Sequence, residues 1–188
     1  MVLVKHHVDH GEWFATIDGV QGILNPNESK SVQSSAAYLD TFCNSRYVDI
    51  GSSTGCTAFI VAKSCNALVY SHHTWPFQCD TPYVDFVRHI DRMSLNRCMI
   101  PVRGEYQETL DIHRPQSIHV AFAHGEQVIE STELIIHKLV PKMHPDGYIL
   151  WKDCFTNSAV MQALVAACYT NHLTYTRADD LVKIVITT

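Results

Sequence analysis

A glycine-bracketed loop at the end of a short apolar run is the residue pattern with the clearest chemical meaning. The run at 47–50 contains the acidic Asp49, and the loop Gly51-Ser52-Ser53-Thr54-Gly55 leads from it into an apolar helical segment. Gly51 lets the backbone turn tightly and approach a ligand, and a helix that starts after Gly55 offers unpaired N–H groups. This order predicts a site for a nucleotide-like cofactor. A tight turn that binds nothing is the alternative.

A dinucleotide fits this loop less well. The G-x-x-x-G spacing lacks the middle glycine of the G-x-G-x-x-G fingerprint, and no acid follows about 20 residues later to bind an NAD ribose. The loop therefore makes a dinucleotide site less favoured.

The elements that must position this loop alternate along the chain. Apolar runs of strand length stand at 47–51, 67–71, 97–102, 118–123 and 148–151, with segments of helical periodicity between them. Such alternation predicts a mostly parallel sheet with helices on both faces. The β-rich runs 173–177 and 181–187 are too close together for anything but a hairpin, so we expect the last strand to be antiparallel.

Helix boundaries are marked by capping residues. In Asn25-Pro26-Asn27-Glu28, Asn25 is the expected N-cap and Glu28 can complete a capping box. Thr81-Pro82 begins a further helix, and His144-Pro145-Asp146-Gly147 is expected to be a turn that ends the helix before it. The expected apolar faces are Val32, Ala36, Leu39 and Cys43 on the first helix, Val84, Val87 and Ile90 on the next, and Ile129, Ile136 and Val140 on the third.

Composition indicates one ordinary globular domain of 188 residues without a membrane span. The net charge of −5 argues against a nucleic-acid partner. Seven cysteines without C-x-x-C spacing indicate reduced thiols, and hence a cytoplasmic location. Among the twelve histidines, the tract 6–10 (HHVDH) has the look of a metal site, but its place near the terminus favours a flexible segment.

Five β–α units closed by an antiparallel hairpin resemble the class I S-adenosylmethionine-dependent methyltransferases over nearly the whole chain. The similarity is greatest to small members related to macrocin-type O-methyltransferases. The stretches that carry it are 19–28 (GVQGILNPNE), 48–55 (VDIGSSTG), 69–75 (VYSHHTW) and 145–153 (PDGYILWKD). The resemblance implies an α/β fold with a Rossmann-like doubly wound sheet of about seven strands, the last of them antiparallel, in a single domain over residues 1–188.

The resemblance also implies a cofactor, S-adenosylmethionine, and the residues that would bind it. Asp49 and the loop Gly51, Ser52, Ser53, Thr54 and Gly55 would hold its amino-acid end. The ribose would meet His72, His73 and Trp75 at the end of the second strand, and the adenine would lie beside Gly104, Glu105 and Tyr106. His124 and Asp153 would flank the methyl group.

Three departures from the family pattern affect the chemistry. His72-His73 stands where members carry an acid for the ribose hydroxyls, and a neutral imidazole accepts only one hydrogen bond. His124 follows the fourth strand where an acid helps to bind magnesium, and the paired acid after the fifth strand is reduced to Lys152-Asp153. Since magnesium prefers hard oxygen ligands, we expect no metal.

The candidate catalytic residues are His124, Lys152 and Asp153. His124 can take a proton from a hydroxyl nucleophile, or it can be a pocket histidine without a chemical role. Lys152 can orient the acceptor or stabilise developing negative charge, or be a solvated lysine. Asp153 can orient His124 or Lys152, or cap the next helix.

The sequence therefore predicts metal-independent O-methyl transfer from S-adenosylmethionine. A catalytically degenerate protein that binds the cofactor or a protein partner without turnover is the main alternative, and RNA 2′-O-methylation using Lys30 and Lys152 is a third. The chain has no insertion for a substrate lid. We expect the first twenty or so residues, together with a second subunit of a homo-oligomer, to cover the site, unless a large acceptor binds an open face.

Overall fold

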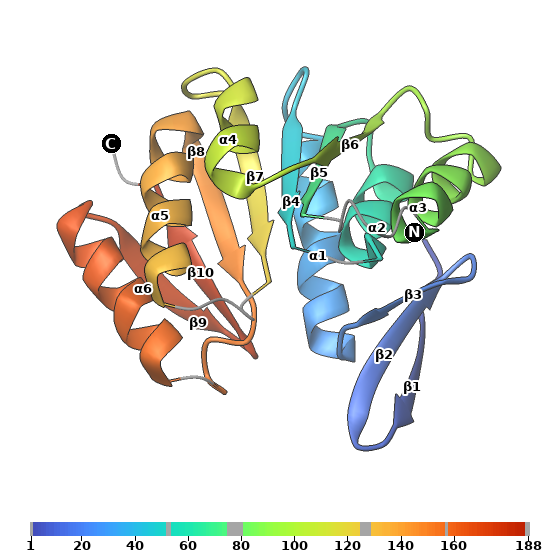
Figure 1. Cartoon of the computed structure of the whole chain (residues 1–188), viewed down its shortest axis with the longest axis horizontal. Helices are drawn as coiled ribbons and strands as arrows, with labels where there is room; N and C mark the ends of the chain where they lie inside the picture. Colours follow the sequence, from blue (N-terminus) through green and yellow to red (C-terminus); the bar gives the residue numbers. More distant parts are fainter. Residues whose placement is uncertain (1, 52–53, 75–80, 125–128, 157, 187–188) are drawn as a thin grey trace.

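The computed structural model describes residues 2–51, 54–74, 81–124, 129–156 and 158–186, which form two β-sheets with helices around the larger one (Figure 1). The strands of the larger sheet are β4 (Arg46–Ile50), β5 (Leu68–His73), β6 (Met99–Arg103), β7 (Ile118–Ala123), β8 (Met143–Trp151), β9 (Thr174–Ala178) and β10 (Leu181–Val185).

The larger sheet has the spatial order β6-β5-β4-β7-β8-β10-β9. Neighbours from β6 to β8 pair in parallel, and β10 is antiparallel to both β8 and β9. The predicted α/β class, the Rossmann-like sheet and the antiparallel last strand are confirmed. The central strand β7 is buried along its whole length, as expected of a parallel strand that is covered on both faces.

Helices cover the two faces of this sheet (Figure 1). One core contains residues of α1 (Pro26–Leu39), α2 (Cys56–Ser64) and α3 (Thr81–Arg92). The other contains residues of α5 (Ile129–Leu139) and α6 (Ser158–Thr170), together with η1 (Leu110–Ile112), which follows the short α4 (Tyr106–Thr109). The turn η2 (Val140–Lys142) links α5 to β8. No helix in these described ranges is long and apolar enough to cross a membrane.

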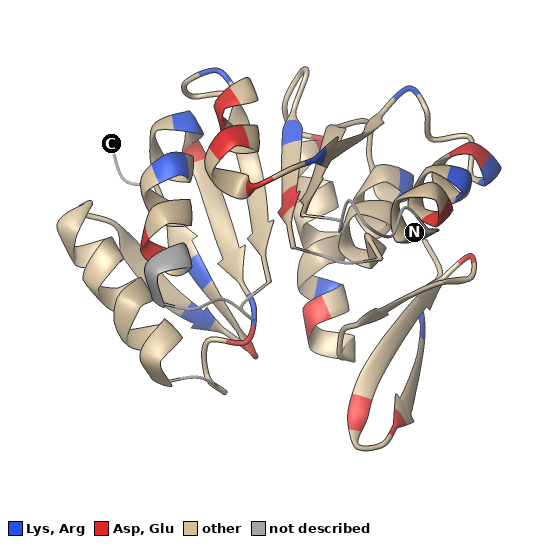
Figure 2. Cartoon of the chain, in the orientation of Figure 1, with Lys and Arg blue, Asp and Glu red and all other residues tan. Residues whose placement is uncertain are grey.

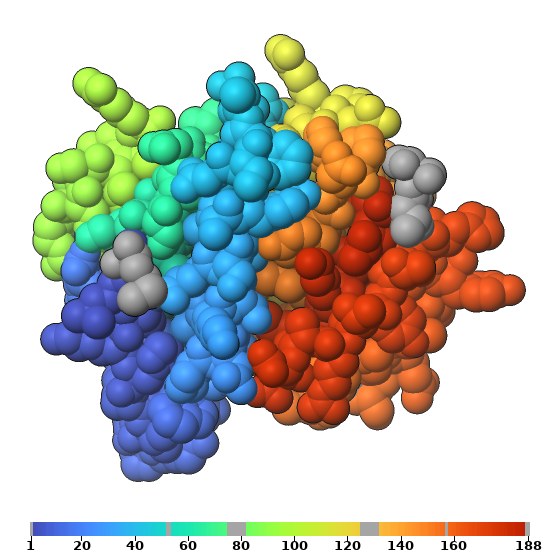
Figure 3. Space-filling view, turned by 180° about the vertical axis from the view of Figure 1, so that it is seen from behind, coloured from blue at the N-terminus to red at the C-terminus, as the bar shows by residue number. Residues whose placement is uncertain are grey.

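A second sheet precedes α1. Its antiparallel strands are β1 (Lys5–Asp9), β2 (Glu12–Ile17) and β3 (Val20–Ile23), and its Ala15, Ile17 and Val20 are buried in the core that includes α1 to α3. The expectation of a flexible histidine tract is wrong, because 5–9 is a paired strand and His6 Nε2 lies 2.9 Å from Ser29 Oγ on α1. Viewed from behind, α1 separates this sheet from the C-terminal hairpin (Figure 3).

The capping box that begins α1 is confirmed. The Glu28 backbone N–H donates to Asn25 Oδ1 at 2.9 Å, and the Asn25 N–H donates to Glu28 Oε2 at 2.8 Å. The apolar faces are only partly as predicted. Cys43 is exposed beyond the end of α1, and on α3 Phe86 and Ile90 are buried while Val84 is 38% exposed.

The expected turn at 144–147 is wrong, since these residues belong to β8 and α5 ends earlier, at Leu139. The β7–β8 pairing shifts register between Ile118 and Val120, and such a bulge accommodates Pro and Gly within a strand. A Cβ at Gly147 would lie 2.9 Å from the carbonyl oxygen of His119, so only glycine lets the two backbones approach this closely.

Candidate functional site

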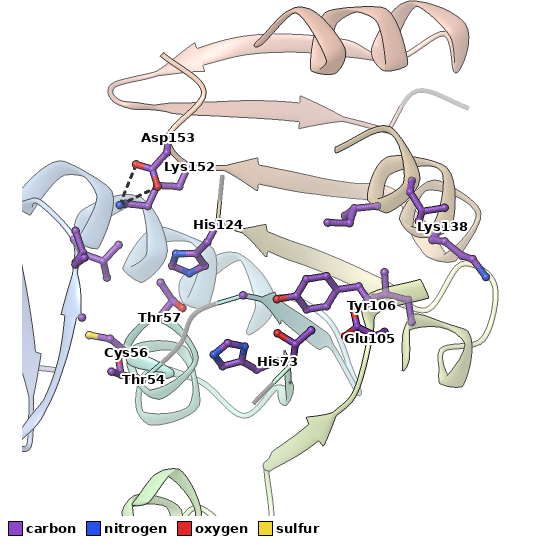
Figure 4. A pocket seen from close by; sticks show the side chains of 18 of the residues that line it. Thr54, Cys56, Thr57, His73, Glu105, Tyr106, His124, Lys138, Lys152 and Asp153 are labelled. Atoms are coloured by element: carbon purple, nitrogen blue, oxygen red, sulfur yellow. Dashed lines mark hydrogen bonds and ion pairs between the residues drawn. The ribbon is translucent and has the colours of Figure 1, made fainter. Parts of the chain in front are cut away.

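A cavity of about 800 Å³ opens at the carboxyl ends of the parallel strands, where ligands bind in open α/β sheets (Figure 4). Its walls come from the N-terminal sheet, the glycine loop, the ends of β5 to β8, and α5. The lining residues are Phe14, Gln21, Gly22, Ile23, Leu24, Gly51, Thr54, Cys56, Thr57, His73, Thr74, Glu105, Tyr106, Gln107, Leu110, His124, Leu134, Ile135, Lys138, Lys152 and Asp153.

The glycine loop has the backbone geometry that the sequence predicts. Gly51 (φ 81°) and Gly55 (φ 78°) are both left-handed, and Gly55 is the N-cap of α2. Gly51 and Thr54 line the cavity, whereas Gly55 does not. A Cβ on Gly55 would lie 2.0 Å from Cε2 of Phe86, so packing against α3 fixes this glycine. Ser52 and Ser53 lie outside the described residues.

Asp49 is fully buried behind this loop. Thr57 Oγ1 donates to its Oδ1 at 2.6 Å, and Thr57 itself lines the cavity. Oδ2 of Asp49 has no hydrogen-bond partner among the described residues. Asp49 itself does not line the cavity. An unpartnered buried carboxylate oxygen is unfavourable, so this atom is suited to a donor or cation.

His124 lines the cavity directly after β7. Its Nε2 lies 3.7 Å from Asp49 Oδ1, which is within ion-pair distance but too long for a hydrogen bond, and its ring packs against Phe122. This nitrogen, too, is buried without a hydrogen-bond partner among the described residues. His124 therefore lies close to Asp49 and lines the same cavity as Gly51 and Thr54.

Lys152 and Asp153 form an ion pair at the end of β8, next to His124 in Figure 4. The Lys152 ammonium donates to both carboxylate oxygens of Asp153, at 3.1 and 3.3 Å, and the lysine is only 6% exposed. Asp153 adopts a left-handed backbone (φ 62°). Lys152 is thus a buried cation and Asp153 contacts it directly. Burial raises the pKa of the nearby Glu28 carboxyl, and the charge of Lys152 partly offsets that rise.

The two histidines at the end of β5 differ in position. His73 lines the cavity, and burial lowers its pKa. His72 is fully buried and does not line it: its Nδ1 lies 3.0 Å from Thr109 Oγ1 and its Nε2 lies 2.8 Å from His113 Nε2. Burial lowers the pKa of His72 to about 3 and that of His113 to about 4. His72 therefore anchors the α4–η1 segment to the sheet, which is not the ribose contact expected of it.

The segment after β6 supplies a further wall. Glu105 and Tyr106 line the cavity, and burial raises the pKa of the Tyr106 hydroxyl. Gly104 does not line it, because its α-carbon faces Thr109, whose Cγ2 would lie 2.9 Å from an added Cβ. Trp75 lies outside the described residues.

Several lining residues were not among the predicted site residues. Phe14, Gln21, Ile23 and Leu24 come from the N-terminal sheet and the residue after it, and Leu134, Ile135 and Lys138 come from α5. Two signals pointed to this region: the family resemblance over 19–28, and the expectation that the first twenty or so residues cover the site.

The fold is that of solved class I S-adenosylmethionine-dependent methyltransferases. An S-adenosylmethionine-dependent O-methyltransferase from Thermotoga maritima matches with a TM-score of 0.64 and 10% identity, covering 98% of this chain and 78% of that chain. A proposed rRNA methylase from Clostridium thermocellum matches with a TM-score of 0.63 and 15% identity, covering 84% of this chain and 96% of that chain.

Geranyl diphosphate methyltransferase, solved in complex with S-adenosylmethionine, matches with a TM-score of 0.61 and 9% identity over 80% of this chain. The present chain spans 66% of that enzyme's length. No family model matches the sequence, and no curated protein matches it. At such low identities the likeness establishes only the fold. The names of these neighbours state different methyl acceptors, so the comparisons do not indicate an acceptor for this chain.

Proposed function

We propose that this protein is an S-adenosylmethionine-dependent methyltransferase that transfers the methyl group to oxygen without a metal ion. The observation that carries the proposal is the inner end of the cavity. There, Nε2 of the lining residue His124 and Oδ2 of Asp49, which lies behind the lining residue Thr57, are buried without a hydrogen-bond partner among the described residues.

The cavity residues fit this cofactor. Its ammonium and sulfonium groups are cationic, and Asp49 offers an unpartnered buried carboxylate oxygen beside Gly51 and Thr54. His73 and the Glu105 carboxylate, at the ends of neighbouring strands, can bind the ribose hydroxyls. Tyr106 and Leu110 provide an apolar wall for the adenine.

His124 is the proposed base. When bound, S-adenosylmethionine supplies an electrophilic methyl group. Asp49 faces Nε2 of His124, which favours the tautomer with a proton on that nitrogen and leaves Nδ1 to accept a proton from the acceptor hydroxyl. The same carboxylate then stabilises the imidazolium that forms.

Lys152 is the proposed electrostatic partner of the acceptor oxygen. It is buried, its ammonium is held by Asp153, and both residues line the cavity next to His124 (Figure 4). A fixed positive charge stabilises an oxygen that develops negative charge as its proton leaves. Asp153 acts here as a positioning residue for Lys152.

The donor set does not resemble a magnesium site. In the part of the chain that the structure describes, no three or more His, Cys, Asp or Glu side chains are grouped to hold a metal ion. The Asp153 oxygens are occupied by the Lys152 ammonium, and the neighbouring lining residue His124 is a nitrogen donor, which is a poor ligand for magnesium.

RNA methylation is less well supported. Lysine and arginine positions are interspersed with aspartate and glutamate positions along the described elements (Figure 2). The net charge of −5 also opposes binding to a phosphate backbone.

The proposal is tested by incubating the protein with methyl-labelled S-adenosylmethionine and a panel of hydroxylated small molecules, with EDTA present throughout. We expect labelled products that carry the methyl group on oxygen, at rates unaffected by EDTA. Transfer to nitrogen, or activity that returns only when magnesium is restored, would contradict the proposal. Cofactor binding without turnover on any acceptor would favour the degenerate alternative.

A further inference from the structure

One wall of the cavity is built by a single face of the N-terminal sheet. Phe14 of β2 pairs directly with Ile23 of β3 and with His7 of β1, so the three side chains project from the same face. Phe14, Ile23 and Gln21 line the cavity. Alternate residues of β2, namely Trp13, Ala15 and Ile17, point to the opposite face and do not line it.

The His7 side chain, on the same face of the sheet, holds this wall in place. The His7 ring stacks on the Phe14 ring, with centroids 5.5 Å apart and planes 19° apart. Nε2 of His7 lies 3.4 Å from Nε2 of Gln21, so the same imidazole contacts both lining side chains. The Phe14 ring and the Gln21 amide are thus pre-positioned, which reduces the entropy lost when a ligand binds against them.

The charge of the lining selects among ligands. Phe14, Gln21, Ile23 and Leu24 are all uncharged. Lys152 and Asp153 line the cavity as an ion pair at the end of β8, so their charges lie on that strand and not on the N-terminal sheet. Of the other ionised lining residues, Glu105 precedes α4, and Lys138 of α5 is paired with Asp111. An ionic ligand would lose its hydration against the N-terminal sheet and find no free counter-charge there.

We infer that the N-terminal sheet is the acceptor-binding element, and that the acceptor is an uncharged small molecule with a flat apolar ring and a hydroxyl group. The ring lies against Phe14 and Ile23, its hydroxyl points to His124 and Lys152, and Gln21 binds a second polar substituent. This inference rests on the proposed methyl transfer and names its substrate class.

The test uses 2-naphthol as the probe, titrated by calorimetry into the full-length protein saturated with S-adenosylhomocysteine. We expect 2-naphthol to bind more tightly than 2-naphthoate or 2-naphthylmethylammonium. Phe14→Ala should weaken its binding roughly tenfold, because an aromatic contact and its buried area are lost. Trp13→Ala is the matched control, since this exposed neighbour on the same strand faces away from the cavity, and it should leave affinity within about twofold.

A second variant addresses Gln21 without removing the ring contact. A second hydroxyl, in 2,6-dihydroxynaphthalene, should tighten binding to the wild-type protein, and this gain should disappear in Gln21→Leu. Binding of S-adenosylhomocysteine should be the same in all three variants, which also shows that they are folded.

Three results would overturn the inference: 2-naphthol affinity unchanged by Phe14→Ala, tighter binding of either charged analogue, or no naphthalene binding by a protein that binds S-adenosylhomocysteine. Failure of S-adenosylhomocysteine itself to bind the wild-type protein is a different result. It would remove the proposed methyltransferase function, and the acceptor assignment with it.

Discussion

Nε2 of His124 lies 3.7 Å from Oδ1 of Asp49. Asp49 belongs to β4 and His124 follows the end of β7, and these two strands are neighbours in the sheet. At β4 the chain order reverses, with β5 on one side and β7 on the other. This is the topological switch point, where the ends of adjacent strands leave room for a ligand. Under the proposed function, this pair is where the cofactor and the reacting oxygen meet.

Replacing His124 should affect turnover far more than cofactor binding. We expect His124→Ala to lower kcat at least about a hundredfold, as loss of a general base does, and to change the Kd for S-adenosylmethionine by less than about threefold. Steady-state kinetics and calorimetry on the same preparation measure both. His137→Ala, on the exposed side of α5, is the control and should behave as wild type. Full activity in His124→Ala would show that this residue is not the base.

Replacing Asp49 should weaken binding of the cofactor. Asparagine keeps the size of the side chain and can still accept the hydrogen bond from Thr57, but it offers an NH₂ group where the unpartnered Oδ2 stands. We expect Asp49→Asn to weaken S-adenosylmethionine binding at least about tenfold, because a charge-assisted contact is lost. Exposed Asp91→Asn on α3 should bind normally. Equal affinity in both variants would argue against a cationic ligand at Asp49.

Gly55 and Gly11 form a matched pair for testing the glycine turn. Both have left-handed backbones, but a Cβ on Gly55 would clash with Phe86, while nothing lies within 4 Å of one on Gly11. We expect Gly11→Ala to lower the free energy of unfolding by about 1 kcal/mol and Gly55→Ala by about 3 kcal/mol. Urea denaturation gives both values. Similar losses in the two variants would mean that Phe86 moves aside without penalty.

The buried His72–His113 pair should make the protein acid-sensitive. Both pKa values are lowered in the folded state, to about 3 and about 4, so below pH 6.5 the unfolded chain takes up protons that the folded chain does not. Stability should therefore fall as the pH drops from about 6.5 toward 4. At pH 5.5 the penalty is on the order of 1 kcal/mol for each histidine relative to neutral pH.

Urea denaturation of the wild type and of the double variant His72→Leu/His113→Leu at pH 7.5 and 5.5 measures this effect. The double variant should lose about 2 to 3 kcal/mol less than the wild type over this interval. An identical loss in both proteins would place the acid sensitivity elsewhere.

Local signals in the sequence account for what could be predicted. The capping box at Asn25 and Glu28, the tight turn at Gly51 and the helix start after Gly55 were identified because each depends on residues close in the chain. The parallel sheet followed from apolar runs alternating with helical segments, and the hairpin at β9 and β10 followed from its short link. These features do not require knowledge of tertiary packing.

Features that depend on register or on distant partners could not be predicted. Side chains alternate along a strand, so whether His72 or His73 faces the cavity depends on a one-residue register that composition does not reveal. Strand β1 carries four polar residues and is ordered by pairing with β2 and by the contact of His6 with Ser29. The cavity wall at Phe14 and Ile23 arises only when this sheet folds over the glycine loop.

Cofactor binding is the claim on which the account depends. Calorimetric titration of the purified protein with S-adenosylmethionine and S-adenosylhomocysteine, with NAD as the control, tests it most directly. We predict micromolar binding of both sulfur compounds, weakened in Asp49→Asn, and no binding of NAD. Absence of binding by either sulfur compound, or binding that is indifferent to Asp49→Asn, would contradict the account and leave a methyltransferase fold with another role.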